Sequence, residues 1–150
     1  DGSPLTAAWP VAGTGPLLRK VKVNPAKLPW LVATTAMTEG STVRHTAPAT
    51  TLEGAKKTEV IMATSSKLSS AYIIPAFMNA VIGTKFKIVS GYKGSARTRQ
   101  AMEQGEVKGV SLAWAAWKNG HPQWFEGSKS FAVGILQSGF KRSPDLPNFR

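Results

Sequence analysis

Two short stretches of the sequence place hydroxyl and glycine residues immediately before a predicted helix. The first is TSSKLSS, residues 64–70, which is followed by Tyr72, and the second is GYKGS, residues 91–95. A helix N-terminus carries unpaired N–H groups and the positive end of the helix dipole, so it suits a carboxylate or a phosphate. Glycine lets the backbone approach such a ligand closely. Taken alone, however, each turn is more typical of plain helix capping by serine.

The periodicity of the apolar residues predicts the elements around these turns. Strands are predicted over 29–35, 41–47, 59–63, 85–92, 107–114 and 130–137, and helices over 50–57, 71–82 and 95–104, with a short helix and turn over 116–127. This alternation predicts an α/β fold, with a doubly wound, mostly parallel sheet that has helices on both faces. Ligands of such sheets bind beyond the carboxyl ends of the strands, so we expect the two turns to converge on one edge.

Capping signals set the predicted helix boundaries. Helix starts are assigned to hydroxyl residues and helix ends to glycines: Thr50 or Thr51, Ser69 or Ser70, and Ser95 for the starts, and Gly83 and Gly105 for the ends. Pro75 lies inside the second helix, so that helix is expected to be kinked or to start later. Spacing of i, i+3, i+4 and i+7 predicts the buried stripe of the third helix, namely Thr98, Ala101, Met102 and Gly105.

The length of 150 residues fits one domain that can bury a core. We expect a loop-rich segment over 1–28, an α/β lobe over 29–140 and an exposed tail over 141–150. The apolar runs are too short for a transmembrane helix. The start DGSPLTAAWP lacks the basic and apolar regions of a signal peptide.

The sequence contains few residues that suit catalysis. The absence of cysteine excludes disulfides, thiolate metal sites and cysteine nucleophiles. His45, in a predicted strand, and His121, in a predicted turn, are not spaced as metal ligands. Glu103 and Glu106 fit a solvated helix face better than a pair of catalytic carboxylates. Because phosphate-loop, dinucleotide and nucleophile-elbow motifs are also missing, we expect no enzyme activity, metal or cofactor.

The charge of the chain favours anionic partners. Nineteen Lys and Arg against eight Asp and Glu give a net charge of +11, which attracts nucleic acid, acidic lipid or small carboxylates. The basic residues are scattered, and core packing explains tryptophans such as Trp117 and Trp124, whose seven-residue spacing predicts one helical face. A basic module that binds nucleic acid or another polyanion therefore stays an alternative hypothesis.

Four strings of the sequence resemble one family. NPAKLPWLVATT, VRHTAPATTLEGAKKTEVIMATSS, VIGTKFKIVSGYKGSARTRQAMEQGEVKG and SFAVGILQSGFKRSPDLPN are similar to the substrate-binding receptors of tripartite tricarboxylate transporters, also called the Bug family. The most specific parts are GTKFKIVSGYKGS and AMEQGEVKG. The resemblance runs from Asn24 to Asn148, which is most of the chain.

This resemblance implies a periplasmic receptor without catalytic activity. Such receptors are two-lobed periplasmic binding proteins that capture a small organic carboxylate and pass it to a membrane permease, and this chain resembles one lobe of type II-like fold. The resemblance implies that ligand-binding residues lie in both turns: Thr64, Ser65, Ser66, Ser69 and Tyr72 in the first, and Gly91, Tyr92, Gly94 and Ser95 in the second. The strand end near Trp114 is a weaker candidate.

Three features depart from the family pattern. The matching stretch corresponds to the second lobe, so a missing first lobe or a second copy in a homodimer is expected to complete the cleft. TSSKLSS has no glycine where the family is glycine-rich, and its Lys67 either adds a cation for the ligand or fills the site. Lys108 stands where the family commonly has Asp, which puts inherited ligand contacts in doubt. A truncated, self-associating remnant that binds no ligand is therefore a second alternative.

Overall fold

The computed structural model describes residues 38–126 and 130–138, all of which belong to one compact unit. The strand predicted over 29–35, the segment 1–28 and the tail 141–150 lie outside the described residues. The elements follow one another in this order: β1 (Glu39–Arg44), α2 (Leu52–Lys57), β2 (Val60–Thr64), α3 (Ser70–Ile82), β3 (Phe86–Ser90), α4 (Gly94–Gln104), β4 (Gly109–Ala113), α5 (Trp114–Gly120), the 3₁₀ helix η3 (Pro122–Phe125) and β5 (Ala132–Ser138).

The described strands form one five-stranded sheet in the order β3-β2-β4-β1-β5. β2 pairs in parallel with β3 and β4, whereas β1 pairs antiparallel with β4 and β5. Four strands therefore run in one direction and β1 runs against them. This arrangement confirms the predicted α/β fold with a mostly parallel sheet.

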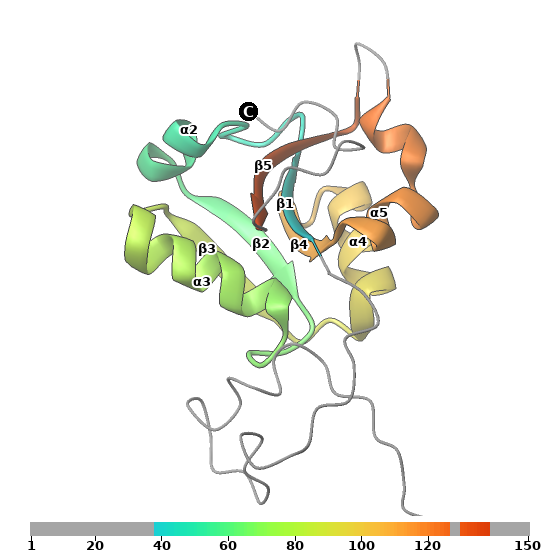
Figure 1. The fold of residues 1–150 in the computed structure, drawn as a ribbon, viewed down its shortest axis with the longest axis horizontal. Coiled ribbons are helices and arrows are strands. Elements are labelled where there is room, and N and C mark those ends of the chain that lie inside the picture. The colour runs from blue at the N-terminus through green and yellow to red at the C-terminus, as the bar shows by residue number, and fades with distance from the viewer. Residues whose placement is uncertain (1–37, 127–129, 139–150) are drawn as a thin grey trace, which may run out of the picture. The chain divides into compact units, whose positions relative to one another are not determined.

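The helices cover both faces of the sheet, as the doubly wound prediction requires. The chain passes from β2 through α3 to β3 at the edge of the sheet, then returns through α4 past β2 to β4. Figure 1 shows α3 on one side of the sheet and α4 with α5 on the other. Each side has its own core, one around Met62 and Met78 and the other around Met102 and Trp117. Among the described helices, none combines the length and the apolarity needed to cross a membrane.

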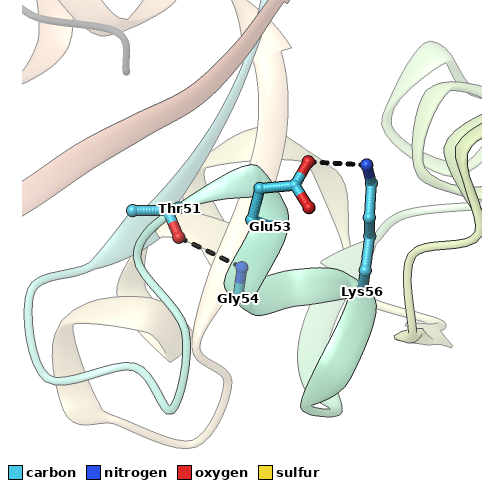
Figure 2. A network of polar contacts seen from close by, with 4 residues as sticks. All are labelled: Thr51, Glu53, Gly54 and Lys56. Atoms are coloured by element: carbon cyan, nitrogen blue, oxygen red, sulfur yellow. Dashed lines mark hydrogen bonds and ion pairs between the residues drawn. The ribbon is translucent and has the colours of Figure 1, made fainter.

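The predicted capping of α2 is confirmed. The Thr51 side chain accepts a hydrogen bond from the backbone N–H of Gly54 at 3.1 Å. Glu53 lies in the first turn, and its carboxylate is 2.6 Å from Lys56 Nζ (Figure 2). Thr51 and Glu53 both stabilise the N-terminus of α2. Thr51 supplies an acceptor to a free N–H group, and Glu53 places negative charge near the positive end of the helix dipole.

The boundaries of α3 and α4 are confirmed at their ends and only in part at their starts. Gly83 and Gly105 end these helices in the left-handed conformation, with φ of 78° and 80°. Ser69 is the N-cap of α3, but its side chain makes no capping hydrogen bond. The cap of α4 is Lys93 rather than Ser95, because Gly94 with φ of 83° turns the chain into the helix before Ser95 is reached.

Pro75 does not delay the start of α3, so the prediction of a later start is wrong. The helix begins at Ser70, and Pro75 lies buried inside it between Ala71 and Met78 on the face that packs on the sheet. Proline removes one backbone hydrogen bond, but burial of this apolar face compensates. In α4, Thr98, Ala101 and Met102 are buried as predicted. The prediction is wrong for Gly105, which is the C-cap of the helix and only half-buried.

The tryptophans described in the structure pack in the core, as predicted. Trp114, Trp117 and Trp124 are all buried, and the rings of Trp117 and Trp124 lie 5.9 Å apart between centroids. The prediction that Trp117 and Trp124 share one helical face is wrong, because α5 ends at Gly120 and Trp124 lies in η3. Pro122 opens that second helix, so the two indoles meet across a turn.

Candidate functional site

One edge of the sheet gathers both turns that the sequence singled out. Thr64 and Ser90 end β2 and β3 and are partners in the parallel register. Ala113 ends β4 and is paired with Glu39, the first residue of the antiparallel strand β1. We call this the carboxyl edge: the ends of β2, β3 and β4 with the turns that follow them, together with the start of β1. It confirms the expectation that the two turns lie at the same edge.

Side-chain hydrogen bonds hold the first turn, Thr64 to Ser69. The hydroxyls of Thr64 and Ser69 lie 2.7 Å apart, and both approach the carbonyl oxygen of Ser66, at 3.2 and 2.8 Å. Two hydroxyl protons serve these three contacts, so at most two of the hydrogen bonds exist at once. The Thr64 side chain is also fully buried, at 0% exposure. These hydroxyls therefore shape the turn, while Ser65 is half-buried and Ser66 and Lys67 are exposed.

Backbone hydrogen bonds tie the second turn to the first. The N–H groups of Gly91 and Tyr92 both donate to the carbonyl oxygen of Thr64, at 3.2 and 3.4 Å. Gly91 has φ of 117° and Gly94 has φ of 83°, and residues with a side chain rarely adopt such positive φ angles. The space around both glycines is open, because a Cβ added at either would meet nothing within 4 Å. Conformation rather than crowding therefore requires glycine here.

Helix N–H groups of both turns lie at the carboxyl edge. In α3 the N–H groups of Tyr72 and Ile73 already donate to the carbonyl oxygen of Ser69, each at 3.0 Å. Those of Ser70 and Ala71 have no acceptor inside the helix, because the first turn of any helix lacks one. The same holds for Ser95 in α4, whose side chain is exposed. The helix starts that follow β2 and β3 thus both carry N–H groups without an acceptor inside the helix.

Tyr92 contributes to the second turn in a different way from that predicted. Its hydroxyl donates to the carboxylate of Glu106 at 2.7 Å, and its ring packs against the tryptophan core. Burial, together with this hydrogen bond and the negative charge of Glu106, raises the pKa of Tyr92 to about 12. The hydroxyl is thus engaged by a side chain that follows α4, and Tyr92 offers the edge its backbone. Tyr72, in the first turn of α3, is half-buried.

Three basic residues in or near the predicted site lie at two different places in the structure. Lys67 and Lys93 are exposed in the two turns themselves. Lys108 instead precedes β4, where its Nζ donates to the carbonyl oxygen of Gly105 at 3.1 Å. The carboxyl edge begins at Ala113, about 16 Å further along at the rise of a strand. Lys108 therefore lies at the end of β4 opposite to the carboxyl edge.

Other candidate residues form no reactive group in the described structure. His45 is exposed and its Nδ1 lies 3.1 Å from the carbonyl oxygen of Phe131, while His121 stacks on Trp124 at 4.3 Å between ring centroids. Within residues 38–126 and 130–138, no three His, Asp or Glu side chains are grouped as metal ligands. Trp114, the weaker candidate, begins α5 directly after β4 and packs with Phe125 in the core.

Sequence reasoning missed Glu39. It starts β1 at the carboxyl edge and is hydrogen-bonded to the side chain of Ser70 in the first turn of α3. Desolvation by burial raises the pKa of Glu39, and the hydrogen bond from Ser70 opposes that effect without cancelling it. An acidic residue just before a predicted strand gives no signal by itself, because only the antiparallel direction of β1 brings it to this edge.

Solved structures of known proteins resemble the fold of this chain, whereas the sequence comparisons find no match. No protein-family model and no curated protein matches the chain. The solved structure of the periplasmic binding protein BugD matches 75% of this chain with a TM-score of 0.61 and 14% identity, and this chain covers 37% of it. A TctC solute binding protein from Polaromonas, solved without ligand, matches 72% with a TM-score of 0.57 and 18% identity, and this chain covers 36% of it.

The chain therefore spans little more than a third of the length of these two binding proteins. At such low identities the likeness establishes the fold. The expectation of a fold like one lobe of a periplasmic binding protein, drawn from the sequence resemblance, is thereby confirmed: the chain is built like part of a Bug- or TctC-type periplasmic binding protein.

Proposed function

We propose that the carboxyl edge binds a small organic carboxylate, as one lobe of a solute-binding receptor. The observation that carries this proposal is the pair of hydrogen bonds from Gly91 and Tyr92 to the carbonyl oxygen of Thr64. They join two helix-initiating turns into one surface rich in donors. The likeness to structures described as periplasmic and solute-binding proteins supports the same function.

Binding on this account is passive. The ligand carboxylate accepts hydrogen bonds from the N–H groups that begin α3 and α4 and from the side chains of Ser65, Ser66 and Ser95, while Thr64 and Ser69 hold the turn in place. Lys67 and Lys93, exposed beside the site, add positive charge. Hydrogen bonds to a charged group contribute about 1.5–3 kcal/mol each, so two or three suffice for a small acid if water is kept out.

A second lobe completes the cleft, supplied either by further chain or by a second copy. The complete receptor acts in the periplasm, delivers its ligand to a membrane permease of a tripartite tricarboxylate-type system, and catalyses no reaction. The net charge of +11 adds long-range attraction for the anionic ligand.

A thermal-shift screen of the purified chain tests the proposal. The panel contains mono-, di- and tricarboxylates and a short DNA duplex. Occupancy at 100 times the dissociation constant stabilises a protein by about 2.7 kcal/mol, so we expect a raised melting temperature with one class of acid. Ser95→Ala should weaken this shift. Stabilisation by DNA alone, lost steeply as salt is added, would contradict the proposal and favour a polyanion-binding module.

A further inference from the structure

Two basic residues meet at the end of the sheet opposite to the carboxyl edge. Arg44 ends β1 and Lys108 precedes β4, and the backbone N–H of Arg44 donates to the carbonyl oxygen of Lys108 at 2.8 Å. Both side chains reach the same glycine, since a Cβ added at Gly105 would lie 2.6 Å from Arg44 Nη1 and 4.0 Å from Lys108 Nζ. We call Arg44 and Lys108 the basic pair.

The basic pair has no acidic partner in the part of the chain that the structure describes. Neither side chain takes part in an ion pair among residues 38–126 and 130–138. Both residues are half-buried, so each positive charge is partly withdrawn from water. Like charges repel each other, and the repulsion grows as the surroundings become less polar. The basic pair therefore lacks the negative charge that would offset it.

Attraction to a helix end explains Lys108 but not Arg44. Gly105 is the C-cap of α4, where the helix dipole is negative, and Lys108 Nζ donates to its carbonyl oxygen at 3.1 Å. The guanidinium of Arg44 has no hydrogen bond to the described residues, and its Nε is buried. Arg99 Nε is buried too, but Arg99 Nη1 donates to the carbonyl oxygen of Ala116 at 3.0 Å. A buried donor without an acceptor is costly, so the Arg44 guanidinium indicates a missing partner.

An aromatic ring holds the Arg44 side chain in place. Its Cζ lies over the ring of Phe131, 5.0 Å from the centroid, which is a cation–π contact. Phe131 packs in turn on Trp124, with 4.4 Å between ring centroids, so the contact rests on the tryptophan core. The ring takes up no N–H group in an ordinary hydrogen bond. These donors therefore stay available to an oxyanion, which a guanidinium binds through two parallel hydrogen bonds.

From these contacts we propose that the basic pair binds a phosphate group. Arg44 donates two hydrogen bonds to the phosphate oxygens, and Lys108 supplies the second positive charge. A phosphate monoester carries a charge of about −1.5 to −2 at pH 7, so it offsets both cations, whereas a single carboxylate offsets one. The phosphate belongs either to a free anion or to a lipid headgroup. Because Arg44 lies at the other end of β1 from Glu39, this inference does not rest on the proposed function.

Amide NMR titrations of the full chain test the inference. Inorganic phosphate is the probe, and acetate at the same ionic strength is the comparison. We expect the amides of residues 44–45 and 105–108 to respond together to phosphate with one dissociation constant. Acetate should bind there about tenfold more weakly, which corresponds to about 1.4 kcal/mol. Cosedimentation with phosphatidylcholine vesicles, with and without phosphatidic acid, shows whether the phosphate of a lipid headgroup is bound as well.

Two variants that change charge equally separate a local effect from a general one. Arg44→Gln and Arg97→Gln each lower the net charge from +11 to +10, since eighteen basic residues then face eight acidic ones. Arg97 is exposed on α4, and its Nη1 donates to Gln100 at 2.6 Å. We expect Arg44→Gln to weaken phosphate binding at least tenfold and Arg97→Gln to leave it unchanged. If Arg44→Gln does not fold, Lys108→Gln replaces it and should weaken phosphate binding in the same direction.

Three results would overturn the phosphate site. One is equal weakening of phosphate binding in Arg44→Gln and Arg97→Gln, which would reflect net charge alone. Another is a response to phosphate that does not saturate or that is confined to residues 70–72 and 91–95. The third is acetate binding at the basic pair as tightly as phosphate. All three leave the proposed carboxylate site untouched, because that site is tested by other residues and other ligands.

Discussion

The two turns at the carboxyl edge are held in place by different interactions. In the first, the side chains of Thr64 and Ser69 bond to each other and to the carbonyl oxygen of Ser66. In the second, backbone N–H groups of Gly91 and Tyr92 attach the chain to Thr64, and positive φ angles at Gly91 and Gly94 set its direction. The first turn uses hydroxyls for structure, and the second uses glycine.

This difference separates residues that hold the site from residues that are available to a ligand. Hydroxyls that bond internally, such as those of Thr64 and Ser69, have little capacity left for a ligand. The hydroxyl of Ser95 makes no hydrogen bond within the described part of the chain, and its side chain is exposed. Changes in the first turn should therefore act mainly on stability, and changes at Ser95 on binding.

Gly91→Ala should have the largest effect. The φ of 117° at Gly91 is strained for any residue with a Cβ, and such strain costs about 1–3 kcal/mol. Urea unfolding of the variant should show a loss of this size. Ser90→Ala is the matched control, because it alters the neighbouring exposed residue at the end of β3. Equal stability of the two variants would mean that the second turn does not depend on glycine.

Thr64→Val should have a smaller effect. Valine keeps the shape of the buried side chain but loses the hydroxyl that joins Ser69 and Ser66, and one such hydrogen bond contributes about 0.5–1.5 kcal/mol. Ser65→Ala removes a hydroxyl from the same turn that makes no hydrogen bond to the described residues. Denaturant midpoints should fall for Thr64→Val alone, and a fall for both would show that the network is not specific.

Ser95→Ala should change stability by less than about 0.5 kcal/mol, as is usual for exposed sites. Its effect should appear in binding, because it removes a donor that the proposed function assigns to the ligand. Ser69→Ala should show the reverse, with lower stability and a smaller direct loss of affinity. Paired unfolding curves and ligand titrations measure both quantities. If Ser95→Ala and Ser69→Ala lost the same affinity and had the same stability, the distinction between a turn that holds the site and a turn that binds the ligand would be contradicted.

The pH dependence of stability should reflect Glu39, which stands beside the first turn. Burial raises the pKa of Glu39 in the folded state above the ordinary 4.5, so the folded protein binds this proton more tightly than the unfolded chain does. The contribution of Glu39 to the free energy of unfolding is complete below its pKa in the unfolded chain. This contribution is lost as the pH rises through its pKa in the folded protein. Compared with Glu39→Gln, the wild type should therefore lose stability from about pH 4 upward. Unfolding measured across that range checks this, and a constant difference would contradict it.

Local patterns predicted much of this fold because they depend on few residues. The stripe of Thr98, Ala101 and Met102 follows from helical spacing, and the stops at Gly83 and Gly105 follow from the conformational freedom of glycine. Parallel strands joined by helices then bring both turns to one edge. These inferences needed no knowledge of distant contacts.

The remaining features depend on contacts between distant parts of the chain. Glu39 reaches the carboxyl edge only because β1 runs antiparallel between β4 and β5. The internal use of the Thr64 hydroxyl depends on how the loop to Ser69 folds back. The start of α4 at Gly94 depends on a backbone angle that a serine-based capping rule does not include.

The central claim is that both turns bind one carboxylate, and amide NMR of the wild-type chain tests it most directly. During titration with the acid that gives the largest thermal shift, the amides of residues 70–72 and 91–95 should move together and give one dissociation constant. A response confined to one turn, or changes only at scattered basic residues, would contradict a shared site at the carboxyl edge.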